Sequence, residues 1–588
     1  MCGFLGIGGK KYKEQKHNLI FSSFEWLKHR GPDQSKFFNL EKFFIGFHRL
    51  SIVGVDNKKA NQPYYSKDKN FYLMFNGEIF NFKELANQWL NKFNFEKEIL
   101  ESDTLVLAKL IEIYGLRCLE WLDGMFSIAI VFEELGKVQL IRDRYGIKPL
   151  YYCIQNNNII FGSHIKPIID IHESIAPNSD AILTYLYTGL YDHSNNTFFK
   201  DIYSVNPGSI IEFDLETKRI RNENWYDIKE FTNIRNRESY NSLLEEIDET
   251  ISRVILDYLP DEVECCINAS GGVDSSLLIN EIFSFKKNIL VQNQDYKIPY
   301  SEKKWIEEYS KKLNIKPIYH LIEPDFILED LKSTFIYQGQ PFGGVTVPGY
   351  TPLYINANKQ NCKVIFDGTG LDEAFLGYPR YASKNFTNNF WKNSIIGSSG
   401  PTDHRGIRPN AINTNLLKKG NLINSSIDEL DGVDHARLMS MNDIAHYKIP
   451  RTTRFTDHSS SRFSLELRSP FLSHKIIHLG MSIESNLLIS DKGTKLPIRD
   501  LLAKKGLPMV AYAPKRYVQS PQNEWLAKEF RDMLKNYIFS DSFYSRGWIK
   551  PEVIKEEYNL YLNSSKENSF YIWQWMSLEI WARTFLDN

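Results

Sequence analysis

Hydrophobic residues in the first 205 positions recur in short runs that are typical of β-strands. We expect strands over residues 43–47, 71–75, 126–132, 138–142 and 159–162, because these runs alternate or are rich in β-branched and aromatic side chains. Asn76-Gly77, Leu135-Gly136 and Pro207-Gly208 are predicted turns. Helices are expected over 20–28 and 103–114. This part should therefore form stacked sheets with flanking helices.

The pattern changes after a polar, charged stretch at about 216–239, which we interpret as a linker. Residues 240–259 carry apolar side chains at helical spacing. Short strands over 263–267, 289–291 and 363–366 then alternate with helices over 275–285 and 303–313. Such alternation predicts a doubly wound parallel sheet. The last third is mostly helical in pattern, and 388–424, rich in Asn, Ser, Gly and Pro, is expected to be a mobile loop.

Length and composition limit the class of protein. A chain of 588 residues exceeds what one hydrophobic core supports, so at least two domains are expected. A formal net charge of −1 argues against a nucleic-acid binder. The longest apolar runs are too short to span a membrane, and residues 1–10 lack the features of a signal peptide.

Cysteine usage adds the expected compartment. Six cysteines without a C-x-x-C pair argue against a zinc or redox motif and favour a reducing, cytoplasmic setting. Cys265 and Cys266 are adjacent on a predicted strand and should face opposite sides.

Cys2 is the first candidate for chemistry. If Met1 is removed, Cys2 carries both a thiol nucleophile and a free α-amino group, whose pKa near ~8 suits it to accept the thiol proton. A cysteine at position 2 has little meaning alone. Its weight comes from Ser270-Gly-Gly-Val-Asp-Ser-Ser276, which has the pattern of a phosphate-binding loop. A site that attacks an amide and a site that binds a nucleotide together indicate ammonia transfer driven by ATP.

A thiol that attacks a carboxamide also needs oxyanion donors and substrate anchors. The Asn76 side chain and the Gly77 backbone N–H form a candidate donor pair, although Asn-Gly is also a common turn. Arg49 could bind the carboxylate of an amino acid, and Glu78 and Asp103 its ammonium group. Taken singly, each of these residues fits an ordinary surface charge better than a ligand-binding one.

An ordered set of motifs over the first 165 residues resembles the class II glutamine amidotransferase domain of the asparagine synthetase family. The motifs are Met1-Cys2-Gly3, His29-Arg30-Gly31-Pro32-Asp33, Arg49-Leu50-Ser51-Ile52-Val53, Asn76-Gly77-Glu78-Ile79-Phe80-Asn81, Ser102-Asp103-Thr104 and Arg142-Asp143-Arg144-Tyr145-Gly146-Ile147-Lys148-Pro149-Leu150-Tyr151. The resemblance implies an N-terminal nucleophile hydrolase fold. It also implies that Cys2 attacks glutamine, that Asn76 and Gly77 form the oxyanion hole, and that glutamine is held by Arg49, Leu50, Val53, Glu78 and Asp103. His164 stands where the family usually has Glu, a departure we expect to be peripheral.

The loop at 270–276 follows a predicted strand and opens a helix, so unpaired N–H groups at the helix N-terminus can face an anion. It lacks the Gly-Lys-Ser/Thr of a Walker A motif. Asp274 instead places a carboxylate where Mg²⁺ beside a polyphosphate could bind. The alternative interpretation is a Gly-rich turn with a serine cap.

The same loop resembles the pyrophosphate loop of ATP pyrophosphatases, and further family blocks follow it at 367–378, 466–472, 495–499 and 514–526. The resemblance implies that ATP is bound by Ser270, Gly271, Gly272, Asp274, Ser275, Ser276, Asp367, Gly368 and Lys495. It implies that Mg²⁺ is bound by Asp274 and Asp372, and that Lys515 neutralises charge on the reacting adenylate.

Departures from the family pattern concern the acceptor. Thr369 stands where the family has Glu or Gln, and a Thr cannot transfer protons near neutral pH, although Asp367 lies two residues away. The segment 344–352 resembles the aspartate-binding segment but lacks its Arg, with Pro348 or a neighbour in its place. Arg462 replaces a small residue, and Ser473 replaces Asp. We take Thr346, Thr369 and Arg462 as candidate acceptor-binding residues.

We therefore predict an α/β protein with a glutamine amidotransferase domain at 1–210, a linker at 211–239 and an ATP-binding synthetase domain at 240–588. It should use glutamine, ATP with Mg²⁺ and a carboxylate acceptor, without nucleic acid or membrane, and a homodimer stays open. The acceptor is aspartate by family default. The alternatives are another carboxylate, such as a sugar uronic acid of a surface polysaccharide, and an inactive scaffold relative.

Overall fold

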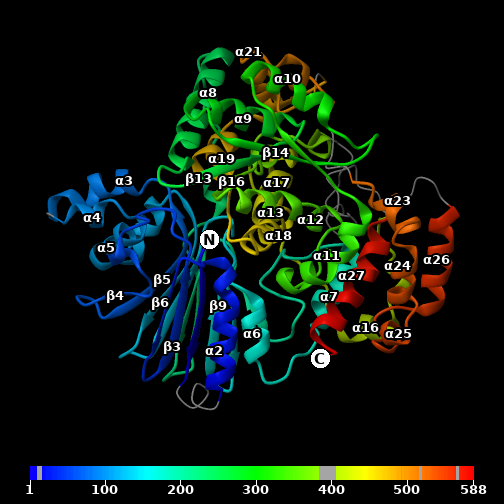
Figure 1. Cartoon of the computed structure of the whole chain (residues 1–588), viewed down its shortest axis with the longest axis horizontal. Helices are drawn as coiled ribbons and strands as arrows, with labels where there is room; N and C mark the ends of the chain where they lie inside the picture. Colours follow the sequence, from blue (N-terminus) through cyan, green and yellow to red (C-terminus); the bar gives the residue numbers. More distant parts are fainter. Residues whose placement is uncertain are drawn as a thin grey trace.

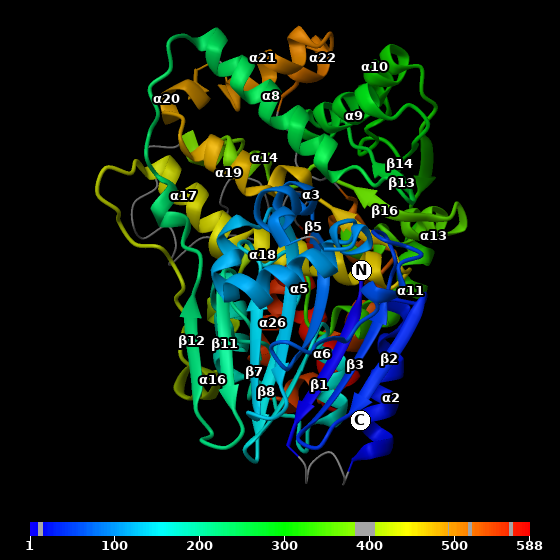
Figure 2. The same ribbon diagram turned by 90° about the vertical axis from the view of Figure 1, so that its left-hand side faces the viewer.

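The structure is a computed structural model that describes residues 1–9, 16–93, 95–382, 406–491, 493–514, 520–563 and 568–587. Within those ranges no helix combines the length and the apolar character that crossing a bilayer requires. Figures 1 and 2 show two sheets of the N-terminal part at one end of the molecule and a third sheet, surrounded by helices, at the other.

The two N-terminal sheets are antiparallel and six-stranded. In spatial order, the first contains β10 (Ile202–Ser204), β8 (Tyr151–Gln155), β9 (Asn158–Gly162), β1 (Gly3–Gly8), β3 (Phe43–Arg49) and β2 (Gln34–Asn39). The second contains β12 (Ile220–Asn224), β11 (Ser209–Asp214), β7 (Lys137–Arg142), β6 (Gly124–Phe132), β5 (Phe71–Ile79) and β4 (Tyr64–Ser66).

The two sheets pack face to face. One buried cluster contains side chains from both, among them Phe4 and Phe47 of the first sheet and Met74 and Leu140 of the second. Helices α2 (His17–Trp26) and α6 (Ile165–Ile171) pack on the outer face of the first sheet. Helices α3 (Phe82–Leu85), α4 (Lys97–Leu100) and α5 (Asp103–Tyr114) lie on the outer side of the second. The result is the four-layer arrangement that the sequence predicted.

The β11–β12 hairpin extends the second sheet into the segment predicted as a linker. β11 pairs with β7, and β12 continues the sheet as far as Asn224. The polar residues of β12 are exposed because β12 is an edge strand. Their polarity was therefore not evidence for a loop. Residues 211–224 therefore belong to the first part of the fold, and the connecting segment begins after them.

The third sheet is parallel and five-stranded, as the strand–helix alternation indicated. Its spatial order is β15 (Ile318–Leu321), β14 (Leu290–Asp295), β13 (Glu264–Asn268), β16 (Cys362–Phe366) and β17 (Glu466–Arg468). Helices α8 (Tyr240–Tyr258), α9 (Val273–Phe285) and α10 (Lys303–Leu313) cover one face, and α13 (Thr351–Lys359) covers the other. Cys265 packs into the first of these layers and Cys266 into the second, so the two thiols face opposite sides as expected.

The C-terminal part is helical and also packs on the N-terminal part. Its α27 (Phe570–Phe585) lies beside α7 (Ser179–Thr188) in Figure 1, and Gln574 of α27 donates a hydrogen bond to the Tyr185 carbonyl of α7. The remaining elements are α7 (Ser179–Thr188), α11 (Pro324–Gln338), α12 (Thr346–Gly349), α14 (Leu371–Ala374), α16 (Thr414–Lys419), α17 (His435–Asn442), α18 (Ile449–Ser461), α19 (His474–Met481), α20 (Ser485–Leu488), β18 (Ile489–Ser490), β19 (Gly493–Thr494), α21 (Leu496–Lys504), α22 (Pro508–Ala511), α23 (Gln522–Ala527), α24 (Arg531–Ile538), α25 (Asp541–Ser545), α26 (Pro551–Asn563) and α27 (Phe570–Phe585).

Most predicted strands and helices are confirmed within a few residues, but two local predictions fail or lie partly out of reach. Asn76-Gly77 is not a turn: β5 runs through it to Ile79, because cross-strand pairing with β6 holds these residues extended. The predicted loop at 388–424 lies outside the described residues as far as 405, and its remainder contains α16.

The N-terminus lies between the two halves of the molecule, at the end of the first sheet that faces the parallel sheet (Figure 2). Met1 and Cys2 are both buried there. The fold thus places the start of the chain against residues more than 400 positions away.

Candidate functional site

Cys2 directly precedes β1 and lies in a small cavity with all five residues predicted to bind glutamine. The side chain is 7% exposed, and its thiol lies 3.9 Å from the Leu50 carbonyl. The cavity, of about 20 Å³, is lined by Cys2, Arg49, Leu50, Ile52, Val53, Gln62, Phe75, Gly77, Glu78, Asp103, Thr104 and Glu466. Burial raises the pKa of the Cys2 thiol, so the sulfur is held as a neutral thiol until a base takes its proton.

Asn76 and Gly77 lie on β5, beside the start of β1; Gly77 lines this cavity, whereas Asn76 does not line it and contacts the Cys2 backbone. The Asn76 Oδ1 accepts a hydrogen bond of 2.9 Å from the Cys2 backbone N–H, and its Nδ2 donates to Ser127. Gly77 has φ of +151°, and a Cβ there would lie 2.0 Å from the Met125 carbonyl oxygen. A glycine is therefore required at this position by both the backbone conformation and the space.

Arg49 and Asp103 face the cavity with their polar groups already engaged by the backbone. Arg49 Nη2 donates to the carbonyls of Val53 and Gly54, at 3.0 and 2.8 Å. Asp103 begins α5 and accepts from the Thr104 N–H at 2.6 Å. Burial raises the pKa of Asp103 to about 6. The cavity in this state, of about 20 Å³, is smaller than a glutamine molecule.

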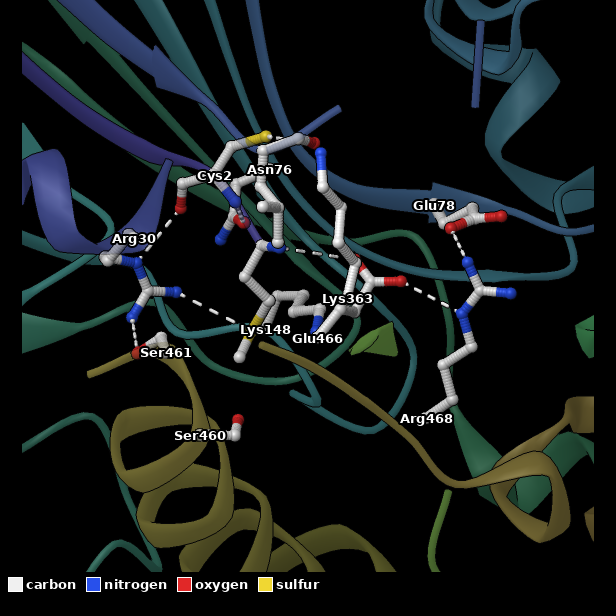
Figure 3. A network of polar contacts seen from close by, with 12 residues as sticks. Cys2, Arg30, Asn76, Glu78, Lys148, Lys363, Ser460, Ser461, Glu466 and Arg468 are labelled. Atoms are coloured by element: carbon white, nitrogen blue, oxygen red, sulfur yellow. Dashed lines mark hydrogen bonds and ion pairs between the residues drawn. The ribbon is translucent and has the colours of Figure 1, made fainter. Parts of the chain in front are cut away.

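Glu78 is bound by a residue from the second half of the chain. Arg468 of β17 forms an ion pair with Glu78 and, through Nε at 3.0 Å, another with Glu466 (Figure 3). Glu466 in turn lies 3.7 Å from the Met1 amino group. Burial raises the pKa of Glu78 despite Arg468. Burial also acts to raise the pKa of Glu466, but the terminal ammonium and Arg468 outweigh it and lower the value to about 2.

A second buried group joins the two halves at Arg30. Its Nε donates to the Cys2 carbonyl at 3.0 Å, Nη1 to Ser461 at 2.8 Å and Nη2 to Asp457 at 2.9 Å. Lys148 lies 3.6 Å from the other oxygen of Asp457. The backbone around the thiol is thus fixed by α18 of the second half (Figure 3).

The Gly-rich loop follows β13 at the carboxyl edge of the parallel sheet and leads into α9. The Ser270 N–H donates to Ser275 Oγ at 2.8 Å, and the Gly272 N–H donates to Ser270 Oγ at 3.3 Å. These bonds close the loop into a compact turn above the helix N-terminus. The carboxyl edge is where ligands bind in open α/β sheets, because strand-to-helix turns converge there.

A cavity of about 880 Å³ opens over this edge, large enough for a nucleotide and a second small molecule. Most residues predicted to bind ATP line it: Ser270, Gly271, Gly272, Asp274, Ser275, Asp367, Gly368 and Lys495. Ser276 is buried in α9 and is not part of the lining. Asp367 accepts hydrogen bonds from Ser469 Oγ and the Thr369 N–H, and burial raises its pKa.

Asp274 and Asp372 converge on Lys495, as the predicted metal site requires. Lys495 is 1% exposed, forms an ion pair with each carboxylate and lies 2.6 Å from Asp372 Oδ1. Burial acts to lower the pKa of Lys495, but the two carboxylates outweigh it and raise the value. Two convergent carboxylates beside a phosphate-type loop fit Mg²⁺ bound with a polyphosphate, since Mg²⁺ takes one or two protein carboxylates and completes its shell with phosphate and water. Among the described residues, no group of three or more His, Cys, Asp or Glu has the arrangement of a metal site made by protein alone.

Two of the three candidate acceptor-binding residues line the large cavity, and the third does not. Thr346 and Thr369 line the large cavity. Arg462 does not: its guanidinium binds both oxygens of Asp330, at 2.8 and 3.1 Å, and lies over the Tyr337 ring. The charge of Arg462 is paired with Asp330, and Arg462 is not an acceptor-binding residue in this structure. Lys515 lies outside the described residues.

Sequence reasoning missed the functional position of Glu466 and Arg468. Both were part of a family block, and their alternation with Leu467 on a strand was a usable signal that they share one face. It also missed Lys448 and Arg451 of the α18 region, which line the large cavity. Two cations near a helix start are not distinctive in sequence.

A buried thiol cavity in an antiparallel sandwich and a nucleotide-type cavity on a parallel sheet define a glutamine-dependent carbon–nitrogen ligase. Residues 1–226 match the family model described as glutamine amidotransferase domain, and residues 246–583 match the one described as asparagine synthase. The second match alone spans more than half of the chain, and the chain belongs to the asparagine synthase family.

Curated relatives agree with this assignment at low identity. Asparagine synthetase [glutamine-hydrolyzing] 1 of Bacillus subtilis is 25% identical, with 99% of this chain and 96% of the relative covered. Putative asparagine synthetase [glutamine-hydrolyzing] 2 of Methanocaldococcus jannaschii is 28% identical, with 64% of this chain and 76% of the relative covered. The similarity to the first extends over both halves.

Proposed function

We propose that this protein transfers the amide nitrogen of glutamine to a carboxylate activated by ATP, and that it releases AMP and pyrophosphate. The position of β17 between the two cavities carries the proposal. Glu466 lines the thiol cavity, and the next residue, Leu467, lines the nucleotide cavity. Because adjacent side chains of a strand point in opposite directions, this short strand forms part of the wall between the sites. Ammonia released beside Cys2 would have a short, buried route to the second site.

The first half-reaction requires that Met1 is removed, which leaves the α-amino group on Cys2. This amine takes the thiol proton, and the sulfur attacks the carboxamide carbon of glutamine. The amide nitrogen receives the proton and leaves as ammonia, and water then cleaves the thioester to give glutamate and the free thiol. Asn76 and Gly77 would stabilise the oxyanion. Arg49, Glu78 and Asp103, with Leu50 and Val53 beside them, would hold the amino-acid end.

In the second half-reaction, an oxygen of the acceptor carboxylate attacks the α-phosphorus of ATP, and pyrophosphate leaves. Ammonia attacks the resulting acyl carbon, AMP leaves, and a proton is lost from nitrogen. Mg²⁺ held by Asp274 and Asp372 would neutralise phosphate charge, and Lys495 supplies further positive charge. Thr369 stands where the family has Glu or Gln, and Asp367, two residues earlier, would take the proton instead.

Two classes of carboxylate are candidates for the acceptor: aspartate, and a different carboxylate such as a sugar uronic acid. Membership of the asparagine synthase family favours aspartate. The threonine at 369 and the segment 344–352, which lacks the expected Arg, favour a different carboxylate such as a sugar uronic acid. The cavity has room for either.

A single set of assays tests the proposal. Purified protein with Mg²⁺–ATP and either glutamine or ammonium is offered a panel of carboxylates, and AMP, pyrophosphate and amide are measured. We expect Cys2→Ala to lose glutamine-driven product and to keep ammonium-driven product, and Asp274→Asn to lose both while still hydrolysing glutamine. An inactive scaffold would release no pyrophosphate with any acceptor, and glutamine-driven product from the Cys2 variant would contradict the nucleophile assignment.

A further inference from the structure

Arg451 is a buried cation of the nucleotide cavity that forms no ion pair with the described residues. It lies in the first turn of α18, is 5% exposed and lines the cavity. Its Nη1 is buried and has no hydrogen-bond partner, and no carboxylate of the described residues lies within ion-pair distance of its guanidinium. A buried guanidinium in this state has lost its water without a replacement, which is costly unless a ligand supplies the missing acceptor.

Other buried arginines near the cavity do form ion pairs with carboxylates. Arg454, one turn further along α18, pairs with Asp192 at 2.6 Å and donates to the carbonyls of Gln338 and Pro341. Arg380 pairs with Asp443. Arg380 Nε has no hydrogen-bond partner either, but Arg380 and Arg454 each have a carboxylate partner. Arg451 forms no ion pair with the described residues and lines the open cavity.

Arg451 and Lys495 both line the cavity, but they have different neighbours. The phosphate end already contains Lys495 between Asp274 and Asp372. Arg451 instead lies at the side formed by Tyr191, with 5.8 Å between its guanidinium carbon and the Tyr191 ring centroid.

Tyr191 and Gly343 lie close together in the cavity wall near Arg451. A Cβ at Gly343 would lie 2.8 Å from the Tyr191 hydroxyl, so the glycine keeps this wall open. Lys448, one turn earlier in the chain, lines the same cavity with its Nζ 3.6 Å from the Tyr378 ring centroid. This side therefore presents to the cavity the guanidinium of Arg451 and the amine of Lys448, whose pKa burial lowers to about 7.

We propose that Arg451 binds a second anionic group of the acceptor, apart from the carboxylate that is activated. This inference rests on the proposed function and narrows its acceptor to dianions: a dicarboxylate, or a carboxylate that also carries a phosphate. The guanidinium replaces, from α18, the Arg that the segment 344–352 lacks. A planar guanidinium fits both carboxylate and phosphate through paired N–H donors.

The test compares acceptors that differ by one anionic group. Ammonium replaces glutamine, so that the thiol site plays no part. The pairs are L-aspartate against β-alanine, and glucuronic acid 1-phosphate against glucuronic acid, with AMP formation as the readout. We expect the wild-type protein to prefer the dianion of at least one pair by roughly 10- to 100-fold in kcat/KM, the range of a charge-assisted hydrogen bond. The pair that responds tells a carboxylate from a phosphate.

Arg451→Gln should abolish that preference mainly through the KM of the dianion, with the KM of ATP within about twofold of wild type. Arg451→Lys should restore part of it, because the charge remains. Arg253→Gln on the exposed surface of α8 is the matched control for loss of one positive charge and should change neither constant. Glutamine hydrolysis by each variant verifies that the protein is folded.

Three results would overturn the inference. One is a wild-type protein that uses the monoanion as well as the dianion in both pairs. Another is a preference that survives Arg451→Gln, and the third is a variant whose main defect is in the KM of ATP, which would make Arg451 a nucleotide contact. If no acceptor gives AMP, it is the proposed function that fails. The binding of the same acceptor pairs is then measured by calorimetry in the presence of an ATP analogue. Equal affinities for the dianion and the monoanion would reject the contact between Arg451 and a second anionic group.

Discussion

The ion pairs of Arg468 allow a quantitative prediction about how the two halves are held together. Arg468→Met keeps most of the side-chain volume but removes the cation that contacts both Glu78 and Glu466. It also removes the hydrogen bond that Arg468 donates to the Tyr258 carbonyl. The variant leaves two carboxylates close together in a buried interface.

The expected loss is large because Arg468 is 0% exposed and both partners are buried. Removing one partner of a buried ion pair costs about 3–5 kcal/mol. With an unfolding entropy of about 2.1 cal/mol/K per residue, this corresponds to a fall of roughly 2.5–4 °C in Tm if the 588 residues unfold as one unit. A smaller cooperative unit would show a larger fall.

The loss should depend on pH in a defined direction. Burial raises the pKa of Glu78 in the folded protein, so its proton favours folding below the unfolded value of about 4.3, and this contribution is lost as pH rises through the folded value. Arg468 opposes that rise, so its removal raises the pKa of Glu78 further. At pH 5 the carboxyl can take a proton and relieve the repulsion. At pH 8 it must stay charged or bind a proton at a cost.

Thermal and denaturant unfolding at pH 5, 6.5 and 8 measure the effect, with Arg253→Met as an exposed control. We expect the deficit of Arg468→Met relative to wild type to grow from pH 5 to pH 8. Arg468 is one of the charges that lower the pKa of Glu466, so its removal shifts that pKa upward as well, in the same direction as the pKa of Glu78. A deficit that is equal at all three values, or greatest at pH 5, would refute the reasoning.

Further predictions concern each site separately. Gly77→Ala should lower the free energy of unfolding by about 1–3 kcal/mol and abolish glutamine hydrolysis, because the added Cβ would lie 2.0 Å from the Met125 carbonyl oxygen. Unfolding experiments and glutamate release measure the two effects, and a fully active variant would contradict the prediction. Lys495→Met should reduce ATP-dependent AMP formation by at least about 100-fold while glutamine hydrolysis persists, since two carboxylates lose their shared cation. If intact mass shows Met1 retained in protein that hydrolyses glutamine, the α-amine of Cys2 cannot be the base.

Local patterns in the sequence determined much of the architecture. The spacing of apolar residues gave α5 and α10 to the residue, and strand β13, the Gly-rich loop and α9 appeared in the correct order. These features depend on side chains that are close along the chain. The candidate residues around Cys2 were also found from sequence, because they lie in ordered motifs, and the structure brings them to one cavity.

The sequence was less informative where a residue depends on distant partners. Asn76-Gly77 has the composition of a turn, yet pairing with β6 makes it part of a strand. Arg462 was expected at the acceptor site but binds Asp330, 132 positions earlier. Composition cannot distinguish a charge that binds a ligand from one that satisfies another charge.

Only the tertiary structure decided how the two halves meet. Arg468 and Glu78 lie 390 positions apart, and Arg30 and Asp457 lie 427 apart. The cost of burying each of these charges is offset only by its partner, so their roles are fixed by which surfaces come together and not by their neighbours in sequence. For the same reason, only the folded cavity shows that Arg451 forms no ion pair with the described residues around it.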